Sequence, residues 1–145
     1  EKDISIPTLS DEDFFIHLCA HLYKEATTLP WVEMLRDMTL YKYCDIYTLF
    51  NDASKEQCDF LFKRAAELGM EKVCAFAVYQ TSKLFQFNNA YMVGLAERAL
   101  DSDAAFIHTV VSPKEKKAYV YYEKDVLERF FSNNRKSLLK EGRIC

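Results

Sequence analysis

Glycine and proline are scarce in this chain, with three of each among 145 residues. Few chain reversals can therefore depend on the backbone angles that these two residues permit or impose. No internal repeat or low-complexity tract is present, and half of the residues are hydrophobic. These features argue against a disordered chain and indicate one folded domain with a sizeable core.

An excess of basic residues is also lacking. Lysine and arginine together number 19, against 22 aspartate and glutamate residues, and the net charge is −3. A chain with this balance has no positive field for a phosphate backbone. Nucleic acid is therefore not an expected partner.

Long apolar runs and paired cysteines are missing as well. No segment approaches the roughly 18 apolar residues that cross a bilayer, and no secretory signal is visible. The five cysteines are odd in number and none forms a CxxC pair. Such cysteines are typical of small buried thiols in a reducing compartment rather than of disulfides or zinc ligands. We therefore expect a cytoplasmic protein that does not contact a membrane.

The pattern that is present predicts a mostly α protein, a single domain over residues 1–145 with five to seven helices. We expect a helical core over about 10–100, a small β-hairpin over about 104–123 and a last helix over about 124–140. Ser10 and the segment "SKEQ" from Ser54 are capping signals for helix starts, and Gly69 is a stop signal. The helical pattern over residues 31–50 has an interruption near Asp37.

The end of the chain has a different period. The runs "AAFIHTVV" and "AYVYYEK" flank "SPKEKK", which predicts two paired strands, although a helical reading of the first run stays open. The last helix is expected to bury Leu127, Phe130, Phe131 and Leu138.

Two histidines, His17 and His21, have the i, i+4 spacing of zinc ligands on a helix. A zincin-type site would have glutamate directly after the first histidine, where this chain has Leu18. A third ligand would have to be His108 or a cysteine. We therefore expect no metal here, with solvated or hydrogen-bonded histidines favoured over a small metal-dependent hydrolase.

The segment "DSD", Asp101 to Asp103, resembles the carboxylate pair of two-metal nucleotidyl transfer. That chemistry needs the acids on a strand that follows a Gly-Ser turn, but Gly94 is followed by Leu95. The segment is therefore interpreted as a loop that ends a helix. The sequence also has no Gly-rich phosphate loop, no GxSxG and no protease-like Cys/His motif, so no catalytic residues are assigned.

Asp45 lies in "LYKYCDIYTLF", a helical segment that is apolar on two sides. Such a helix is usually buried centrally, and a buried carboxylate needs a partner. We expect Asp45 to be buried and hydrogen-bonded to the first helix, with His21 favoured over Lys24 as its partner.

Three segments, taken in order, resemble a known family: "LSDEDFFIHLCAHLYKEA", "LYKYCDIYTLF" and "FLFKRAAELGMEKVCAFAVYQTSKLF". Their order and spacing are similar to those of the helical C-terminal part of the uncharacterised nucleotidyltransferase family of bacterial proteins. The similarity covers residues 9–86. The polar positions that carry over are His21, Lys24, Glu25 and Asp45, and with Lys42 they form the candidate polar cluster.

The resemblance implies that the catalytic residues lie outside this chain, in another part of a longer polypeptide. The family's catalytic half is similar to polymerase-β-type transferases, and its Gly-Ser turn and acid pair lie N-terminal to this region. A chain that begins with glutamate instead of methionine fits a domain cut from such a polypeptide. The implied partner is the N-terminal catalytic domain of the same polypeptide. The full-length enzyme would use Mg²⁺ and a nucleoside triphosphate, and this chain would hold no cofactor.

The leading hypothesis is therefore that this chain is a helical domain of a nucleotidyltransferase, with a substrate-binding, acceptor-binding or accessory role. The domain is not expected to be active by itself. The alternative is a free-standing protein-interaction module with an aromatic-rich surface. The candidate cluster has two readings that the sequence leaves open, a buried pair that specifies the fold or the floor of a cleft.

Overall fold

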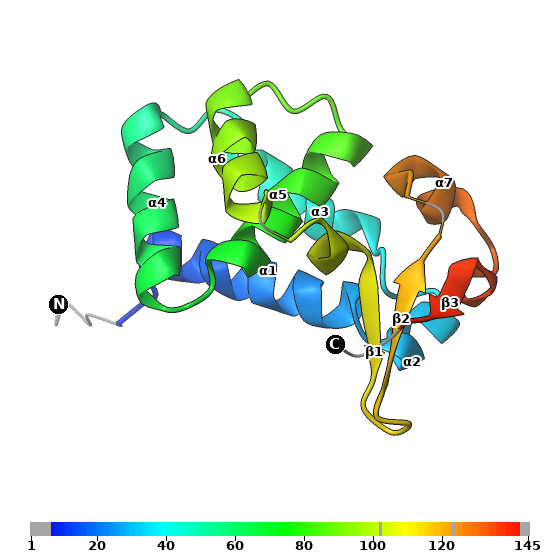
Figure 1. Ribbon diagram of the computed structural model, residues 1–145. Helices are drawn as coiled ribbons and strands as arrows, with labels where there is room; N and C mark the ends of the chain where they lie inside the picture. The colour runs from blue at the N-terminus through cyan, green and yellow to red at the C-terminus, as the bar shows by residue number, and fades with distance from the viewer. Residues whose placement is uncertain (1–6, 102, 123, 143–145) are drawn as a thin grey trace, which may run out of the picture.

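Seven α-helices and a three-stranded sheet form the part of the chain that the computed structural model describes, residues 7–142 without 102 and 123 (Figure 1). The predicted mostly α fold with a small sheet is confirmed. The α-helices are α1 (Asp11–Ala26), α2 (Leu29–Glu33), α3 (Leu40–Phe50), α4 (Lys55–Glu67), α5 (Glu71–Leu84), α6 (Ala90–Leu100) and α7 (Val126–Phe131).

The predicted helix boundaries are confirmed where a capping residue sets them. The Ser10 hydroxyl accepts a hydrogen bond from the backbone of Asp13 at 3.1 Å. At α4, Ser54 and Gln57 exchange side-chain-to-backbone hydrogen bonds, which is a complete capping box. Gly69 follows α4 with a φ of 69°, a left-handed angle that glycine adopts without strain.

Helix α5 lies at the centre of the helical layer, where it contacts α1, α3, α4, α6 and α7 (Figure 1). Small residues such as Ala75 and Ala77 let neighbouring helices approach, and Phe76 fills the core. The expectation that residues 40–50 form the central helix is wrong. Helix α3 packs on both α1 and α5, and it leaves Tyr41 and Leu49 exposed.

The predicted hairpin is present, but it is shorter than expected and has a third strand. The strands are β1 (Thr109–Ser112), β2 (Lys117–Tyr121) and β3 (Leu139–Glu141), antiparallel in the order β1-β2-β3. The start of the first run is a 3-10 helix, η1 (Ala104–His108). The expected last hairpin residue, 123, lies outside the described residues.

The sheet is fastened to the turn between α1 and α2. The backbone N–H of Val111 donates to the carbonyl of Thr27 at 2.8 Å. Leu29 and Val32 from α2 pack with Val110 and Tyr121 in a second, smaller core. The sheet therefore covers α2 and brings its residues close to the α2–α3 connection.

A single helix over about 124–140 is wrong. Helix α7 ends at Phe131, a 3-10 turn η2 (Arg135–Leu138) follows, and the chain continues as β3. The Asn134 side chain caps η2, while Arg135 turns into the interior. The periodicity placed Leu127 and Phe131 in the core, but Phe131 is 78% exposed and Leu127 is also exposed.

The predicted interruption near Asp37 is confirmed, because α2 ends at Glu33 and α3 begins at Leu40. Cys19, Cys58 and Cys74 are buried free thiols and Cys44 is a partly buried one, as expected, whereas Cys145 lies outside the described residues.

None of the helices in the described ranges is both long enough and apolar enough to traverse a lipid bilayer.

Candidate functional site

A groove of about 190 Å³ runs between α1 and α3. Its lining residues are His17, Leu18, His21, Tyr41, Lys42 and Asp45. The two histidines come from successive turns of α1, since residues four apart share a helix face. Tyr41 and Asp45 share the facing side of α3 for the same reason. The groove thus collects polar side chains from two segments that lie some twenty residues apart in the sequence.

Lys42 is held at the base of this groove by Glu25. Its ammonium donates a hydrogen bond to Glu25 Oε2, and the two side chains are 13% and 10% exposed. His21 Nδ1 lies 3.2 Å from Lys42 Nζ and 3.4 Å from Glu25 Oε1. A carboxylate that is nearly buried needs such a partner, and Lys42 provides it.

Asp45 does not have the predicted position. Its side chain is exposed, and the acid that is buried against the groove is Glu25 on the first helix. The prediction of a buried Asp45 bound to His21 or Lys24 is therefore wrong. Lys24 is exposed and does not line the groove. Of the candidate cluster, His21, Glu25 and Lys42 touch one another, while Asp45 lies at the opening.

The groove carries a small negative charge. Glu25 and Asp45 contribute two carboxylates, Lys42 contributes one ammonium, and neutral histidines add none. The Tyr41 side chain is 61% exposed and lies beside Lys42, whose Nζ is 5.8 Å from the ring centroid. An open aromatic ring beside hydrogen-bonding groups is suited to a polar, uncharged or weakly cationic ligand.

The histidine pair is not joined by a third metal-ligating side chain in the described residues, where no group of three such residues meets. The His17 and His21 ring centroids are 6.4 Å apart. His108, the third ligand considered from sequence, does not line the groove, and burial together with the nearby positive charges of Arg129 and Lys124 lowers its pKa.

The loop interpretation of "DSD" is confirmed for the two acids. Asp101 is the C-cap of α6, and Asp103 accepts a hydrogen bond from Lys72 Nζ at 3.1 Å. Ser102 lies outside the described residues.

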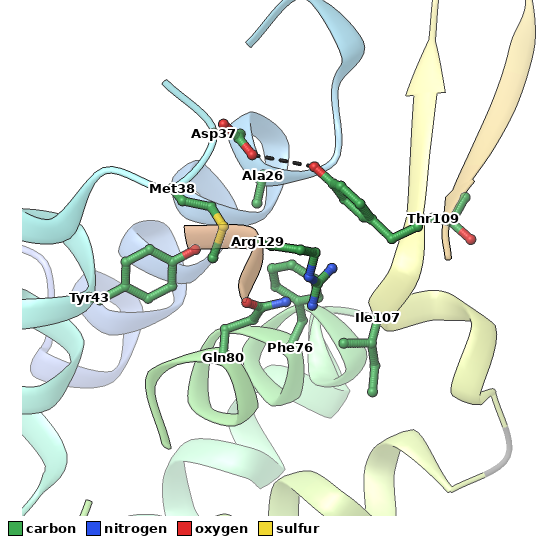
Figure 2. Close-up of a pocket in the computed structure, with 10 residues that line it drawn as sticks. Ala26, Asp37, Met38, Tyr43, Phe76, Gln80, Ile107, Thr109 and Arg129 are labelled. Atoms are coloured by element: carbon green, nitrogen blue, oxygen red, sulfur yellow. Dashed lines mark hydrogen bonds between the residues drawn. The ribbon is translucent and has the colours of Figure 1, made fainter. Parts of the chain in front are cut away.

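A second polar cluster, which the sequence analysis missed, is buried between the helices and the sheet (Figure 2). Arg135 Nε donates to Asp37 Oδ1 at 2.8 Å, and the Tyr121 hydroxyl donates to Asp37 Oδ2 at 3.4 Å. Burial outweighs the neighbouring guanidinium and raises the pKa of Asp37 above its usual value. Arg129 and Tyr43 complete this cluster.

Residues 1–86, more than half of the chain, match the family model described as uncharacterised nucleotidyltransferase. The chain belongs to the uncharacterised nucleotidyltransferase family. The resemblance drawn from the three sequence segments is thereby confirmed. Comparison with curated proteins and with solved structures gives no match.

The groove lies entirely within the part of the chain that matches the uncharacterised nucleotidyltransferase family. The buried cluster does not, because Asp37 and Tyr43 lie within the matched segment whereas Tyr121, Arg129 and Arg135 lie beyond it. The groove is therefore the candidate functional site that goes with the family.

The residues that the sequence analysis missed are charged groups in the interior. Arg129 lies three positions after Val126, so the two residues share the buried face of α7. The helical spacing therefore indicated a buried position for Arg129, whereas its charge favoured an exposed one. Asp37 lies in the connection between α2 and α3, where helical periodicity does not indicate which side chains are buried. The break in the helical pattern was the one feature of the sequence that pointed to this position.

Proposed function

We propose that this chain is the acceptor-binding helical domain of a nucleotidyltransferase, and that the groove between α1 and α3 holds an acceptor rich in hydroxyl groups. The family membership supports the reaction class. The charge and chemistry of the groove support the acceptor role over the nucleotide role.

The observation that carries this choice is the locked position of Lys42. Its ammonium is hydrogen-bonded to Glu25, so it offers little uncompensated positive charge to a triphosphate. Together with Asp45, the groove has a net negative charge. A bare phosphate is disfavoured in such a field, whereas hydroxyl groups can donate to Asp45 and bond to the histidines.

His21 has a defined place in this proposal. His21 Nδ1 lies near both Lys42 Nζ and Glu25 Oε1, and we assign it the tautomer in which Nδ1 is unprotonated and accepts from Lys42, which is a donor only. In the neutral ring the proton is then on Nε2, and this N–H donates to an acceptor oxygen. Tyr41 offers its ring face to the apolar face of a sugar or polyol.

Catalysis in this proposal belongs to another part of the enzyme. The N-terminal catalytic domain of the same polypeptide supplies the acid pair, which holds Mg²⁺ and the nucleoside triphosphate. The helical domain then contributes position, which converts an encounter between two substrates into a reaction at one site.

A titration followed by NMR tests the assignment. Glucose and myo-inositol, as hydroxyl-rich probes, are expected to shift backbone resonances of α1 and α3 at millimolar concentrations. MgATP at the same concentrations is expected to leave them in place. Tyr41→Ala should abolish the shifts, and the matched control Tyr122→Ala, which removes an exposed tyrosine elsewhere, should retain them. Shifts of the groove by MgATP but not by the polyols would contradict the proposal.

A protein-interaction role is the second candidate, and α7 favours it. Leu127 and Phe131 are one turn apart and both exposed, and Phe131 lines a hollow of about 290 Å³ together with Glu128 and Leu138. Exposed apolar side chains that gather at one place mark interaction sites in soluble proteins. Under this alternative, Phe131→Ser would weaken association with the protein partner and leave the polyol titration unchanged.

A further inference from the structure

A small cavity of about 10 Å³ lies in the interior of the second polar cluster. Helices α3, α5 and α7 and strand β2 converge on it through Tyr43, Gln80, Arg129 and Tyr121. Figure 2 shows the side chains of Gln80 and Arg129 reaching this space from α5 and α7. The volume is enough for about one water-sized group.

The charges around this cavity do not balance. Asp37 is the nearby carboxylate, and its two oxygens accept hydrogen bonds from Arg135 and Tyr121. Arg129 is 2% exposed, and no ion pair joins it to an acid of the described residues. Because a guanidinium keeps its charge at physiological pH, the cluster contains one buried positive charge without a counter-charge.

Hydrogen-bond donors around the cavity also lack partners in the described part of the chain. These groups are Nε and Nη2 of Arg129 and the hydroxyl of Tyr43. The Tyr121 ring lies 4.6 Å from the Arg129 guanidinium, but this contact involves the ring face and leaves the N–H groups unbonded. Buried donors without acceptors are rare because each forfeits its hydrogen bond to water.

Gln80 can add a further donor. Its Oε1 is buried and has no donor in the described residues. Rotation of the side-chain amide by half a turn exchanges this oxygen for the NH₂ group. The cavity can thus be surrounded by N–H and O–H groups from three residues on three different helices.

The pKa of the half-buried His108 is affected by the same excess of positive charge. Burial, together with the positive charges of Arg129 and Lys124, lowers its pKa to about 4. A positive potential in this region favours an anion, in addition to the unpaired donors.

We propose that this cavity binds one monovalent anion of halide size, chloride under ordinary conditions, which neutralises Arg129 and accepts hydrogen bonds from Arg129 and Tyr43. A water molecule could accept the same hydrogen bonds but would leave the charge uncompensated. Chloride is somewhat larger than a water molecule, so the side chains of Arg129 and Gln80 must move slightly apart to admit it, whereas phosphate, sulfate and carboxylates would need a much larger space. The site is independent of the groove and of the acceptor role proposed for it.

Denaturant unfolding at constant ionic strength tests the proposal in the 145-residue chain. Sodium chloride is exchanged stepwise for sodium gluconate, whose anion is too large for the cavity. A ligand that binds only the folded state shifts the folding equilibrium by a factor of 1 + [L]/Kd. We expect a saturable stabilisation by chloride that reaches about tenfold in the equilibrium constant when chloride is ten times its Kd.

Two variants separate the bound anion from general effects of the salts. Arg129→Met removes the charge and keeps a long apolar stem, and Tyr43→Phe removes a single hydroxyl and preserves the shape of the core. The first should abolish the saturable dependence on chloride and the second should weaken it. The control Arg64→Met removes an arginine at an exposed ion pair and should behave as the parent chain does.

Diffraction gives a result that does not depend on the stability of any variant. Crystals grown in sodium bromide should show one anomalous peak between Arg129 and Tyr43. A peak at that place together with the chloride dependence supports the site. Density for water without an anomalous signal, or equal stability of the parent chain in chloride and gluconate, would overturn the proposal.

Discussion

Asp37 and Arg135 form a buried ion pair across 98 residues of sequence, with Arg135 Nε 2.8 Å from Asp37 Oδ1. Their side chains are 1% and 6% exposed. The same guanidinium donates from Nη1 to the carbonyls of Phe130 and Ser132 at 3.1 and 3.2 Å. One arginine therefore joins the α2–α3 connection to the end of α7.

Removal of one partner of this pair should be strongly destabilising. We expect Asp37→Ala to lower the free energy of unfolding by about 3 to 5 kcal/mol, because it leaves Arg135 charged and buried without a counter-charge. Urea denaturation measures this change. The control Glu33→Ala breaks the exposed pair of Glu33 with Lys136 and should cost at most about 1 kcal/mol. Equal losses for the two variants would contradict the buried pair.

Glu25 should have a comparable role at the base of the groove. We expect Glu25→Ala to cost about 2 to 3 kcal/mol of stability, because Lys42 loses its partner while it remains largely buried. The neighbouring Lys24→Ala, at an exposed position on the same helix, should change stability by less than about 0.5 kcal/mol. Denaturant melts of both variants test the pairing. A Glu25→Ala variant as stable as the Lys24→Ala variant would show that Lys42 does not depend on Glu25.

His108 should make the fold sensitive to acid. Its pKa is about 4 in the folded protein and about 6.5 when the chain is unfolded. Between these values the unfolded chain binds more protons, so stability falls as the pH falls from about 6.5 to 4. The full shift corresponds to about 3 kcal/mol, and partial exposure of the ring reduces the expected loss to about 1 to 2 kcal/mol.

The contribution of His108 can be isolated by substitution. Urea melts across this pH range should show a flatter profile for His108→Gln than for the parent chain. His17→Gln, which changes an exposed histidine, should leave the profile unchanged. Identical profiles for the parent and His108→Gln would show that the ring does not titrate in this way.

Asn89 connects two helices through its side chain. Its amide nitrogen donates to the carbonyls of Phe50 and Ala53 at 3.0 and 2.9 Å, and its oxygen caps α6 by accepting from Met92 at 3.0 Å. We expect Asn89→Ala to cost about 2 kcal/mol, because it removes a helix cap and the two hydrogen bonds that the amide donates to the carbonyls of Phe50 and Ala53. Asn88→Ala is the control, since Asn88 is held by its backbone N–H. Thermal unfolding of both variants should show a lower midpoint for Asn89→Ala alone.

The sequence predicts those parts of the fold that a few neighbouring residues determine. The caps at Ser10 and Ser54, the stop at Gly69 and the turn between β1 and β2 all depend on residues within about one turn of each other. Local hydrogen bonds and backbone angles fix such features, so tertiary contacts rarely change them.

The errors arise where a distant residue decides the structure. The periodicity of residues 125–139 indicates a helix, but Arg135 leaves that pattern to meet Asp37. Similarly, Asp45 and Glu25 are both acids on apolar helices, and only the approach of Lys42 from α3 decides that Glu25 is the buried one. Periodicity describes one helix at a time and contains no information about the facing charge.

The shared use of α5 has a consequence for the evolution of the family. One side of this helix packs on α1 and α3, inside the segment that matches the family model, and another packs on α6 and α7, outside that segment. A related chain that shares only the first segment must cover α5 with some other element and must supply a different cation for the acid at position 37. We therefore expect substitutions at Asp37 in relatives whose second half differs from this one, because the cation that pairs with Asp37, Arg135, lies in that half.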